Sequence, residues 1–258
     1  KVIILDRPNP INGNIIEGNI LQPGFESFVG LHPIPMRHGL TIGEMALYLK
    51  KFYHPNCEVK VIAMENWDRN FFWENTGLPW IPPSPNLPTM ESSFTFVGTV
   101  LFEGTNISEG RGTTRSLEIV GHPSIEPFSA LFEIQKDLEE FPLEGFKLRP
   151  MVFCPTFQKF QNKACGGFHI HITDNSKFRP WLLGQFLCRY FYKKLGNNFK
   201  WNNKPYEYQF AGLAIDFING NSTVRQWVEK HGSYKELEKI EKNGHKDYLE
   251  KRKEILLY

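Results

Sequence analysis

The sequence lacks the short motifs that identify the commonest nucleotide, metal and acyl-transfer sites. It contains no GxGxxG fingerprint, Walker loop, HExxH zinc motif or GxSxG elbow. Its 258 residues carry 30 Lys and Arg against 28 Asp and Glu, so the net charge of +2 gives no electrostatic reason to expect nucleic acid as a partner. No apolar run approaches the roughly 20 residues of a membrane helix, and the first residues lack the order of a signal peptide. These absences favour a small polar ligand, with no nucleic acid and no membrane span.

Cysteine is scarce, and the four cysteines form no CxxC pair and no cluster with histidines of the structural zinc kind. We expect buried thiols. Cys154 and Cys165 flank an expected turn between two strands, so a disulfide between them stays open, and with it the redox compartment.

The apolar and aromatic content is high enough, at 41% and 14%, to bury a real core. The first third has βαβ character: Lys1 to Leu5 is an apolar run typical of a buried parallel strand, and Glu58 to Met64 forms the next strand. Between them, a helix is expected over Ile42 to Phe52, because Thr41 and Glu44 fit a capping box. Residues 12 to 30 have the composition of a loop.

The remainder alternates helix and strand. Helices are expected over Ser129 to Glu140 and Pro180 to Lys194, and a hairpin over Phe146 to Phe153 and Gly166 to Thr173. A proline-rich passage from Leu78 to Thr89 separates the two parts. The sequence therefore predicts an α/β unit over residues 1–72 and an α+β domain over residues 73–258.

The stretch from Leu101 to Thr114 reads as a site loop, because it has no periodicity and concentrates glycines with polar side chains. Gly104, Gly110 and Gly112 allow backbone amides to turn inward beside Arg111 and meet an anionic or oxygen-rich ligand. The alternative is equally open: Arg111 pairs with a structural carboxylate within an ordinary glycine-rich connection.

Further polar residues follow the expected strands and turns. Asp6, Arg7 and Asn9 come after the first strand, at the edge where open α/β sheets bind ligands, unless the prolines there make a stiff turn. Arg37 and His38 precede a helix N-terminus, whose dipole is expected to lower the pKa of His38.

Two other segments carry candidate side chains. Ser84 and Asn86 lie with Trp80 in the proline-rich passage, and an aromatic ring beside amide and hydroxyl groups suits a sugar. His169 and His171 fall on one face of a strand, a geometry compatible with a metal. Without a third ligand, we favour histidines of the core or rim over zinc, and no pattern calls for a cofactor.

Four motifs together resemble one family. They are LDRPNP from Leu5, PIPMRHGLTIGE from Pro33, LPWIPPSPNLPT from Leu78 and EGTNISEGRGTT from Glu103, in the order and spacing of the DUF1343 family, which includes NamZ-like exo-β-N-acetylmuramidases. The resemblance covers essentially the whole chain. After Thr114 the chain departs from the family, because RSLEIVGHPS replaces the usual Pro-Phe-Glu and Gly-Ala-Pro-Trp.

The resemblance implies a glycoside hydrolase that releases N-acetylmuramic acid (MurNAc) from the non-reducing end of peptidoglycan fragments such as MurNAc–GlcNAc. It implies a partial Rossmann-like unit followed by an α+β domain, with the site in the cleft between them, and an extracytoplasmic location. Glu103 is the first candidate catalytic carboxylate, with Asp6 and His38 as further candidates. Arg111 is expected to bind a substrate carboxylate, and substrate contacts are also expected from Arg7, Asn9, Arg37, Ser84, Asn86, Thr105, Asn106 and Thr113.

Family members carry an upstream segment with a PEHG motif, whose glutamate is the favoured catalytic residue, and no stretch of this sequence corresponds to it. We therefore expect a chain beginning at Lys1 to bind muramic-acid fragments weakly and to hydrolyse them slowly or not at all. Two alternatives stay open: a non-catalytic sugar-binding module or inactive fragment, and an unrelated anion-binding protein that uses the glycine-rich loop for phosphate.

Overall fold

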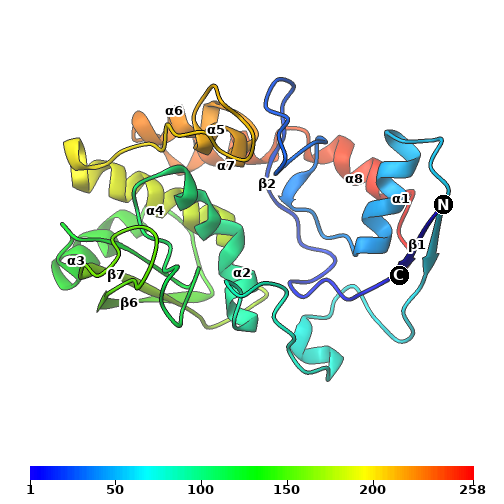
Figure 1. Ribbon diagram of the computed structural model, residues 1–258, viewed down its shortest axis with the longest axis horizontal. Helices are drawn as coiled ribbons and strands as arrows, with labels where there is room; N and C mark the ends of the chain where they lie inside the picture. Colours follow the sequence, from blue (N-terminus) through cyan, green and yellow to red (C-terminus); the bar gives the residue numbers. More distant parts are fainter.

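The computed structural model describes residues 1–258, arranged as three small sheets with helices around them (Figure 1). The strands and helices follow one another as β1 (Val2–Leu5), β2 (Glu17–Ile20), β3 (Pro35–Arg37), α1 (Ile42–Phe52), β4 (Val59–Ile62), η1 (Trp73–Thr76), α2 (Met90–Thr99), η2 (Val100–Gly104), β5 (Ile119–His122), α3 (Pro127–Leu138), β6 (Phe146–Phe153), β7 (Cys165–Ile172), α4 (Pro180–Leu195), η3 (Gly196–Asn198), α5 (Ala214–Asn219), α6 (Thr223–Glu229), α7 (Tyr234–Lys242) and α8 (His245–Lys253).

The βαβ unit at the start of the chain is confirmed. Strands β1 and β4 pair in parallel, with Val2 opposite Val59, and α1 makes the connection between them. The capping box is also present: the Thr41 hydroxyl accepts from the Glu44 amide at 3.1 Å, and the Glu44 carboxylate accepts from the Thr41 amide at 3.0 Å. The expectation that β1 is buried is wrong, since Ile3 is 58% exposed on this two-stranded sheet.

Strand β2 lies where the sequence predicts a loop, and it pairs with β3 in a short antiparallel hairpin. Its charged residues connect the first third of the chain to α4. Glu17 accepts from the Leu182 amide at 3.0 Å and lies 3.6 Å from Arg37, and both side chains are fully buried. Burial raises the pKa of Glu17 to about 7, although Arg37 opposes the shift.

The third sheet is antiparallel in the order β5-β7-β6, and it is separate from the β1–β4 sheet as predicted. Phe168 and Ile170 of β7 belong to the main core, together with α4, whose side chains are mostly buried. Helix α2 crosses α4 at a glycine pair: a Cβ atom on Gly98 would lie 2.0 Å from the Pro180 carbonyl oxygen, and one on Gly184 would meet Gly98.

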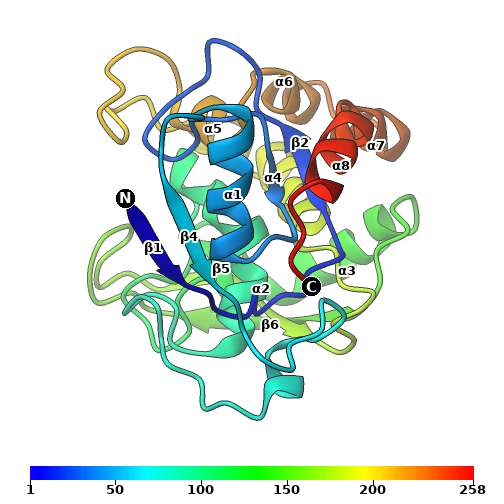
Figure 2. The ribbon, with the colours of Figure 1, turned by 90° about the vertical axis from the view of Figure 1, so that its right-hand side faces the viewer.

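The last residues of the chain return to its first third, as Figures 1 and 2 show for α8 beside α1. Tyr248 of α8 packs on Tyr48 of α1 with ring centroids 5.7 Å apart, in a small core that also contains Leu40 and Ile255. Residues from the end of the chain therefore complete the small core beneath α1. The division at residue 72 stays a prediction.

All four cysteines are free thiols, so Cys154 and Cys165 form no disulfide in this structure. Cys165 is buried and Cys154 is exposed at the end of the β6–β7 hairpin. None of the helices combines the length and the apolar character needed to cross a membrane.

Candidate functional site

The glycine-rich stretch from Leu101 to Thr114 begins within η2, which ends at Gly104, and continues as a loop that packs closely against neighbouring segments. Gly110 and Gly112 both have positive φ, at 79° and 84°. A Cβ atom on Gly112 would lie 2.8 Å from backbone atoms of Phe157, and one on Gly104 would lie 2.7 Å from Ile215. Glycine is required here for backbone contact with neighbouring segments as well as for turn conformation.

The charged side chains of this loop bond mainly to one another. Arg111 contacts Glu103 through Nη2 and lies 3.2 Å from Glu109 through Nε. Lys159 donates to Glu109 at 2.8 Å, and the Tyr206 hydroxyl donates to Glu103 at 2.8 Å. Arg111 and Glu103 keep about a fifth of their side-chain surface open, at 17% and 22%. The structure therefore shows the ion-pair alternative for Arg111, whose guanidinium already faces two carboxylates.

The other predicted side chains of the loop also bond within the protein. Thr105 donates to the Phe102 carbonyl at 2.9 Å, and Thr113 donates to the Gly110 carbonyl at 2.6 Å. Asn106 connects the loop to η3, since it donates to the Asn198 carbonyl at 2.8 Å and accepts from the Lys200 amide at 2.9 Å. Each of these bonds fixes the shape of the loop.

Immediately after the loop, Glu118 is the centre of a second polar network. Its side chain is almost fully buried, and it accepts from the Thr89 hydroxyl. Oε2 lies 3.4 Å from both Nη1 of Arg115 and Nε2 of His169. Burial raises the pKa of Glu118, but the hydrogen bonds from His169 and Thr89 and the charge of Arg115 outweigh it, so the net shift is downward. Glu118 is thus held as a carboxylate.

Histidines continue this network along β7. His169 and His171 lie on one face of the strand, as predicted, with ring centroids 4.0 Å apart. Arg149 of β6 is opposite His169 in the register, and its Nη2 lies 3.4 Å from Nδ1 of that histidine. Burial lowers the pKa of His171, and the neighbouring His169 and Arg149 add to this effect. No group of three or more His, Cys, Asp or Glu side chains is placed to hold a metal ion. We call Thr89, Arg115, Glu118, Arg149, His169 and His171 the Glu118 cluster.

Part of the proline-rich passage lies beside the Glu118 cluster. Asn86 accepts a long hydrogen bond of 3.5 Å from the Ser116 hydroxyl, two residues before Glu118. Ser84 accepts from the Asn86 amide at 3.3 Å, and so shapes the turn that presents Asn86. Trp80 packs edge-on against Trp73 instead, with ring centroids 5.4 Å apart.

Asp6 is enclosed in the first third of the chain. It accepts from the hydroxyls of Thr41 at 2.7 Å and Tyr258 at 2.8 Å and from the Gly43 amide at 2.8 Å, and it is 2% exposed. These bonds tie β1, the start of α1 and the last residue together, which is a structural task. Arg7 is exposed and donates to the Asp6 carbonyl at 2.8 Å.

The remaining predicted residues from this part are also engaged. Asn9 donates to the Leu40 carbonyl at 2.9 Å, and Arg37 donates to the Ile11 carbonyl at 2.6 Å besides facing Glu17. Both interactions fix loops of the first third, and Arg37 is fully buried.

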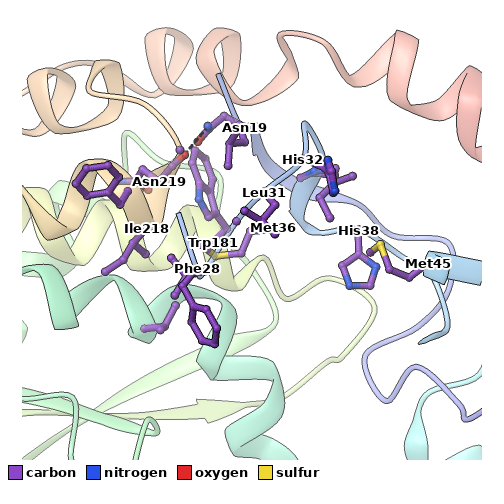
Figure 3. Close-up of a pocket in the computed structure, with 18 of the residues that line it drawn as sticks. Asn19, Phe28, Leu31, His32, Met36, His38, Met45, Trp181, Ile218 and Asn219 are labelled. Atoms are coloured by element: carbon purple, nitrogen blue, oxygen red, sulfur yellow. Dashed lines mark hydrogen bonds between the residues drawn. The ribbon is translucent and has the colours of Figure 1, made fainter. Parts of the chain in front are cut away.

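His38 lies at a cavity of about 620 Å³ between the β2–β3 hairpin, α1 and the helices α2, α4 and α5 (Figure 3). Its Nδ1 accepts from the Leu40 amide at 3.0 Å, and its pKa falls to about 4. The cause is burial first and the charge of Arg252 second, and the direction of the shift is the predicted one. His38 is therefore neutral near pH 7.

The predicted site residues do not all face one cleft. Tyr206 lines the cavity of His38 and bonds Glu103, so His38, Glu103 and Arg111 are linked through this tyrosine. Asn86 instead lies beside the Glu118 cluster, and Asp6 is enclosed near the C-terminus. The expectation of a single cleft is corrected for Asp6, because donors from Thr41, Gly43 and Tyr258 enclose its carboxylate.

Sequence reasoning missed Glu118, Arg115, Arg149 and Tyr206. One signal was available for Glu118: an acidic residue stands between Leu117 and Ile119, in a run that is otherwise suited to a buried strand. The pairing of His169 with Arg149 depends on the register of β6 and β7, which the sequence does not fix.

Comparisons with known proteins agree along the whole chain. The family model described as "Exo-beta-N-acetylmuramidase NamZ, N-terminal" matches residues 1–91, and the corresponding C-terminal model matches residues 94–258. A curated relative from Bacillus subtilis (strain 168), the peptidoglycan β-N-acetylmuramidase NamZ, is 37% identical over 257 residues, which is 99% of this chain and 59% of the relative.

Two solved structures of DUF1343 family proteins from Bacteroides fragilis NCTC 9343 have similar folds. One superposes with a TM-score of 0.84 at 25% identity, covering 99% of this chain and 66% of that one. The other has a TM-score of 0.70 at 29% identity, covering 100% of this chain and 66% of that one. The chain thus spans less than two thirds of the length of each of these proteins.

Proposed function

This chain belongs to the family of the exo-β-N-acetylmuramidase NamZ, and from that premise we propose that it acts in the hydrolysis of peptidoglycan fragments, releasing MurNAc from their non-reducing ends. Because the chain spans 59% of the B. subtilis relative, the activity of the whole relative is carried over as a proposal. An extracytoplasmic location, where peptidoglycan lies, is part of the same proposal.

The observation that best supports this function is the open cationic side of the Glu118 cluster. Arg115 keeps half of its side-chain surface exposed, and Arg149 is exposed as well, next to His171, whose lowered pKa favours the uncharged ring. MurNAc differs from GlcNAc by a lactyl group that ends in a carboxylate. The planar fork of arginine suits a carboxylate, so we assign the lactyl group to Arg115 and Arg149. Arg111 is less suited, because Glu103 and Glu109 already occupy its guanidinium.

Glu118 is the positioning residue of this surface. It is too deeply buried to touch a sugar, but its carboxylate holds both Arg115 and His169 at 3.4 Å. The loop brings this network close to that of Glu103, since the Leu117 amide donates to the Glu109 carbonyl at 2.7 Å. The sugar would therefore bind over the segment that joins the two networks.

Glu103 remains our proposed catalytic carboxylate within this chain. Glycoside hydrolysis generally uses two carboxyl groups around the scissile bond, one as acid and one as base or nucleophile. Glu103 accepts from Arg111 and Tyr206, and this arrangement suits the ionised partner that stabilises positive charge on the sugar. We assign no catalytic role to Asp6, whose oxygens are enclosed by structural donors.

The experiment is release of MurNAc from MurNAc–GlcNAc by the purified chain, followed by chromatography, with Glu103→Gln as the matched variant. Release by the wild type, reduced about 10²- to 10⁴-fold in the variant, would support the proposal. Saturable binding of the disaccharide without release would support the alternative of a non-catalytic sugar-binding module. If the chain neither binds the disaccharide nor releases MurNAc, both the proposed function and this alternative are contradicted.

A further inference from the structure

Two exposed aromatic side chains meet at the edge of the cavity beside His38. Phe28 lines this cavity (Figure 3), and Tyr208 belongs to the segment between η3 and α5. The two rings pack edge-on, with centroids 5.7 Å apart, yet Phe28 stays 72% and Tyr208 77% exposed. Large aromatic side chains that are packed together and open to solvent mark a surface that another molecule covers. We call Phe28 and Tyr208 the aromatic platform.

The turn that carries Tyr208 is built to display its ring. Tyr206 and Gln209 exchange two backbone hydrogen bonds, at 3.0 and 2.8 Å, around the two central residues. These residues, Glu207 and Tyr208, both have positive φ, at 44° and 68°. Such turns normally use Asn, Asp or Gly, so a large aromatic side chain here is not explained by the needs of the turn. Gln209 also donates to the Glu26 carbonyl at 3.4 Å, which fastens the turn to the neighbouring segment.

The same turn reaches the proposed catalytic carboxylate. Tyr206 lines the cavity together with Phe28, and its hydroxyl donates to Glu103 at 2.8 Å. At the start of the segment, Asn202 donates to the Glu103 carbonyl at 3.1 Å through its side chain. Its backbone amide donates to the Gly104 carbonyl at 2.8 Å. The aromatic platform is therefore continuous with the Glu103 network.

The surroundings of the platform favour an uncharged ligand. None of the residues that line the cavity is Asp, Glu, Lys or Arg. The charged residues nearest to the two rings in sequence are Glu26 and Glu207, and both are acidic. A carboxylate would lose its hydration here without gaining a cation, whereas the apolar C–H face of a neutral sugar ring can be buried on an aromatic ring.

We propose that the aromatic platform binds the neutral sugar that follows MurNAc in the substrate, the GlcNAc ring that keeps the leaving oxygen. Its C–H face lies on Tyr208 and Phe28, while the lactyl carboxylate of MurNAc lies at the Glu118 cluster. Glu103 falls between the two, since it contacts Arg111 in one direction and Tyr206 in the other. The identity of this sugar rests on the proposed function.

The test measures binding by protein-observed NMR, with methyl β-N-acetylglucosaminide as the probe and glycerol, which has hydroxyls but no ring face, as the negative control. We expect saturable shifts of the Tyr208 and Phe28 ring signals with the glucosaminide and none with glycerol. Tyr208→Ala should weaken binding by about threefold or more, because the stacking face is lost. Tyr208→Phe keeps the ring and should bind as the wild type does.

A matched pair of phenylalanine variants provides the control. Phe28→Ala should weaken binding, whereas Phe128→Ala, at a position on α3 that is 69% exposed, should leave it unchanged. The platform is overturned if Tyr208→Ala binds as the wild type does, or if the two phenylalanine variants behave alike. Analytical ultracentrifugation adds a further outcome: a dimer that dissociates in Phe28→Ala would show that a second copy covers the platform, and would overturn the choice of sugar.

MurNAc release from MurNAc–GlcNAc is measured separately, so that the two proposals can fail independently. Release without binding of the glucosaminide, and with the same KM in Tyr208→Ala and wild type, refutes the platform and leaves the proposed function intact. Binding of the glucosaminide at the two rings without any release of MurNAc retains the platform as a sugar site and contradicts the proposed hydrolysis.

Discussion

Nε2 of His169 lies 3.4 Å from Oε2 of Glu118, across 51 residues of sequence, and this contact joins the middle strand of the antiparallel sheet to the end of the glycine-rich loop. It fixes a histidine next to Arg149 and His171, whose side chains open to solvent. The proposed sugar-binding surface depends on this connection.

Thr89 both caps α2 and donates to Glu118, so Thr89→Val should lower the free energy of unfolding by about 1–3 kcal/mol. Thr89→Ser keeps the hydroxyl and should cost much less. Urea unfolding followed by circular dichroism measures both variants. Equal stability of Thr89→Val and wild type would show that the hydroxyl is not needed to satisfy Glu118.

Arg111 holds Glu103 and Glu109 together, so Arg111→Gln should destabilise the protein by about 1–3 kcal/mol, since two carboxylates would then lose their shared cation. Arg7→Gln, at an exposed position, is the matched control and should change stability little. Differential scanning calorimetry distinguishes the two. If Arg111→Gln is as stable as the control and loses sugar binding, Arg111 is a ligand-binding arginine after all.

The two ends of the chain meet through Asp6 and Tyr258, whose hydroxyl also accepts from the Met64 amide at 2.7 Å. Tyr258→Phe removes both bonds and should cost about 1–3 kcal/mol in unfolding free energy. The exposed Tyr208 provides the matched Tyr→Phe control, expected to cost less than 0.5 kcal/mol. Chemical denaturation of both variants would refute the contact if their midpoints coincide.

His38 predicts a pH dependence with a definite sign. Its pKa of about 4 in the folded state is below the ordinary value of 6.5, so the unfolded chain takes up its proton first as the pH falls. The stability that His38 contributes is complete above pH 6.5 and is lost between pH 6.5 and 4. The total is on the order of 3 kcal/mol, since one pKa unit corresponds to about 1.4 kcal/mol. His38→Gln should flatten this part of the stability profile, and an unchanged slope in the variant would contradict the assignment.

Local patterns in the sequence predicted much of the fold. Thr41 and Glu44 predicted the start of α1, because a capping box depends on residues close in sequence. The apolar and alternating runs predicted the strands β1, β4, β6 and β7, and the order of strand, helix and strand predicted the parallel pairing of β1 with β4 across 57 residues. Exposure of β1 was missed, since an apolar run carries no information about which partner covers it.

The candidate site was harder to predict, because long-range packing decides which polar groups remain available. Arg111 and Glu103 are eight residues apart and pair directly, so composition placed them together but did not show that the pair is mutually satisfied. Glu118 meets His169 only through the register of the sheet, and Asp6 meets Tyr258 only when the tail returns to α1. Neither contact has a local sequence signal.

The most direct test of the account is calorimetric titration of the chain with MurNAc–GlcNAc and with GlcNAc–GlcNAc, which lacks the lactyl carboxylate. We predict tighter binding of the MurNAc disaccharide by about tenfold or more, with this preference lost in Arg149→Gln and kept in Arg179→Gln, a matched change at the start of α4. Equal affinities for the two disaccharides, or a preference that survives in Arg149→Gln, would contradict the assignment of this surface to muramic acid.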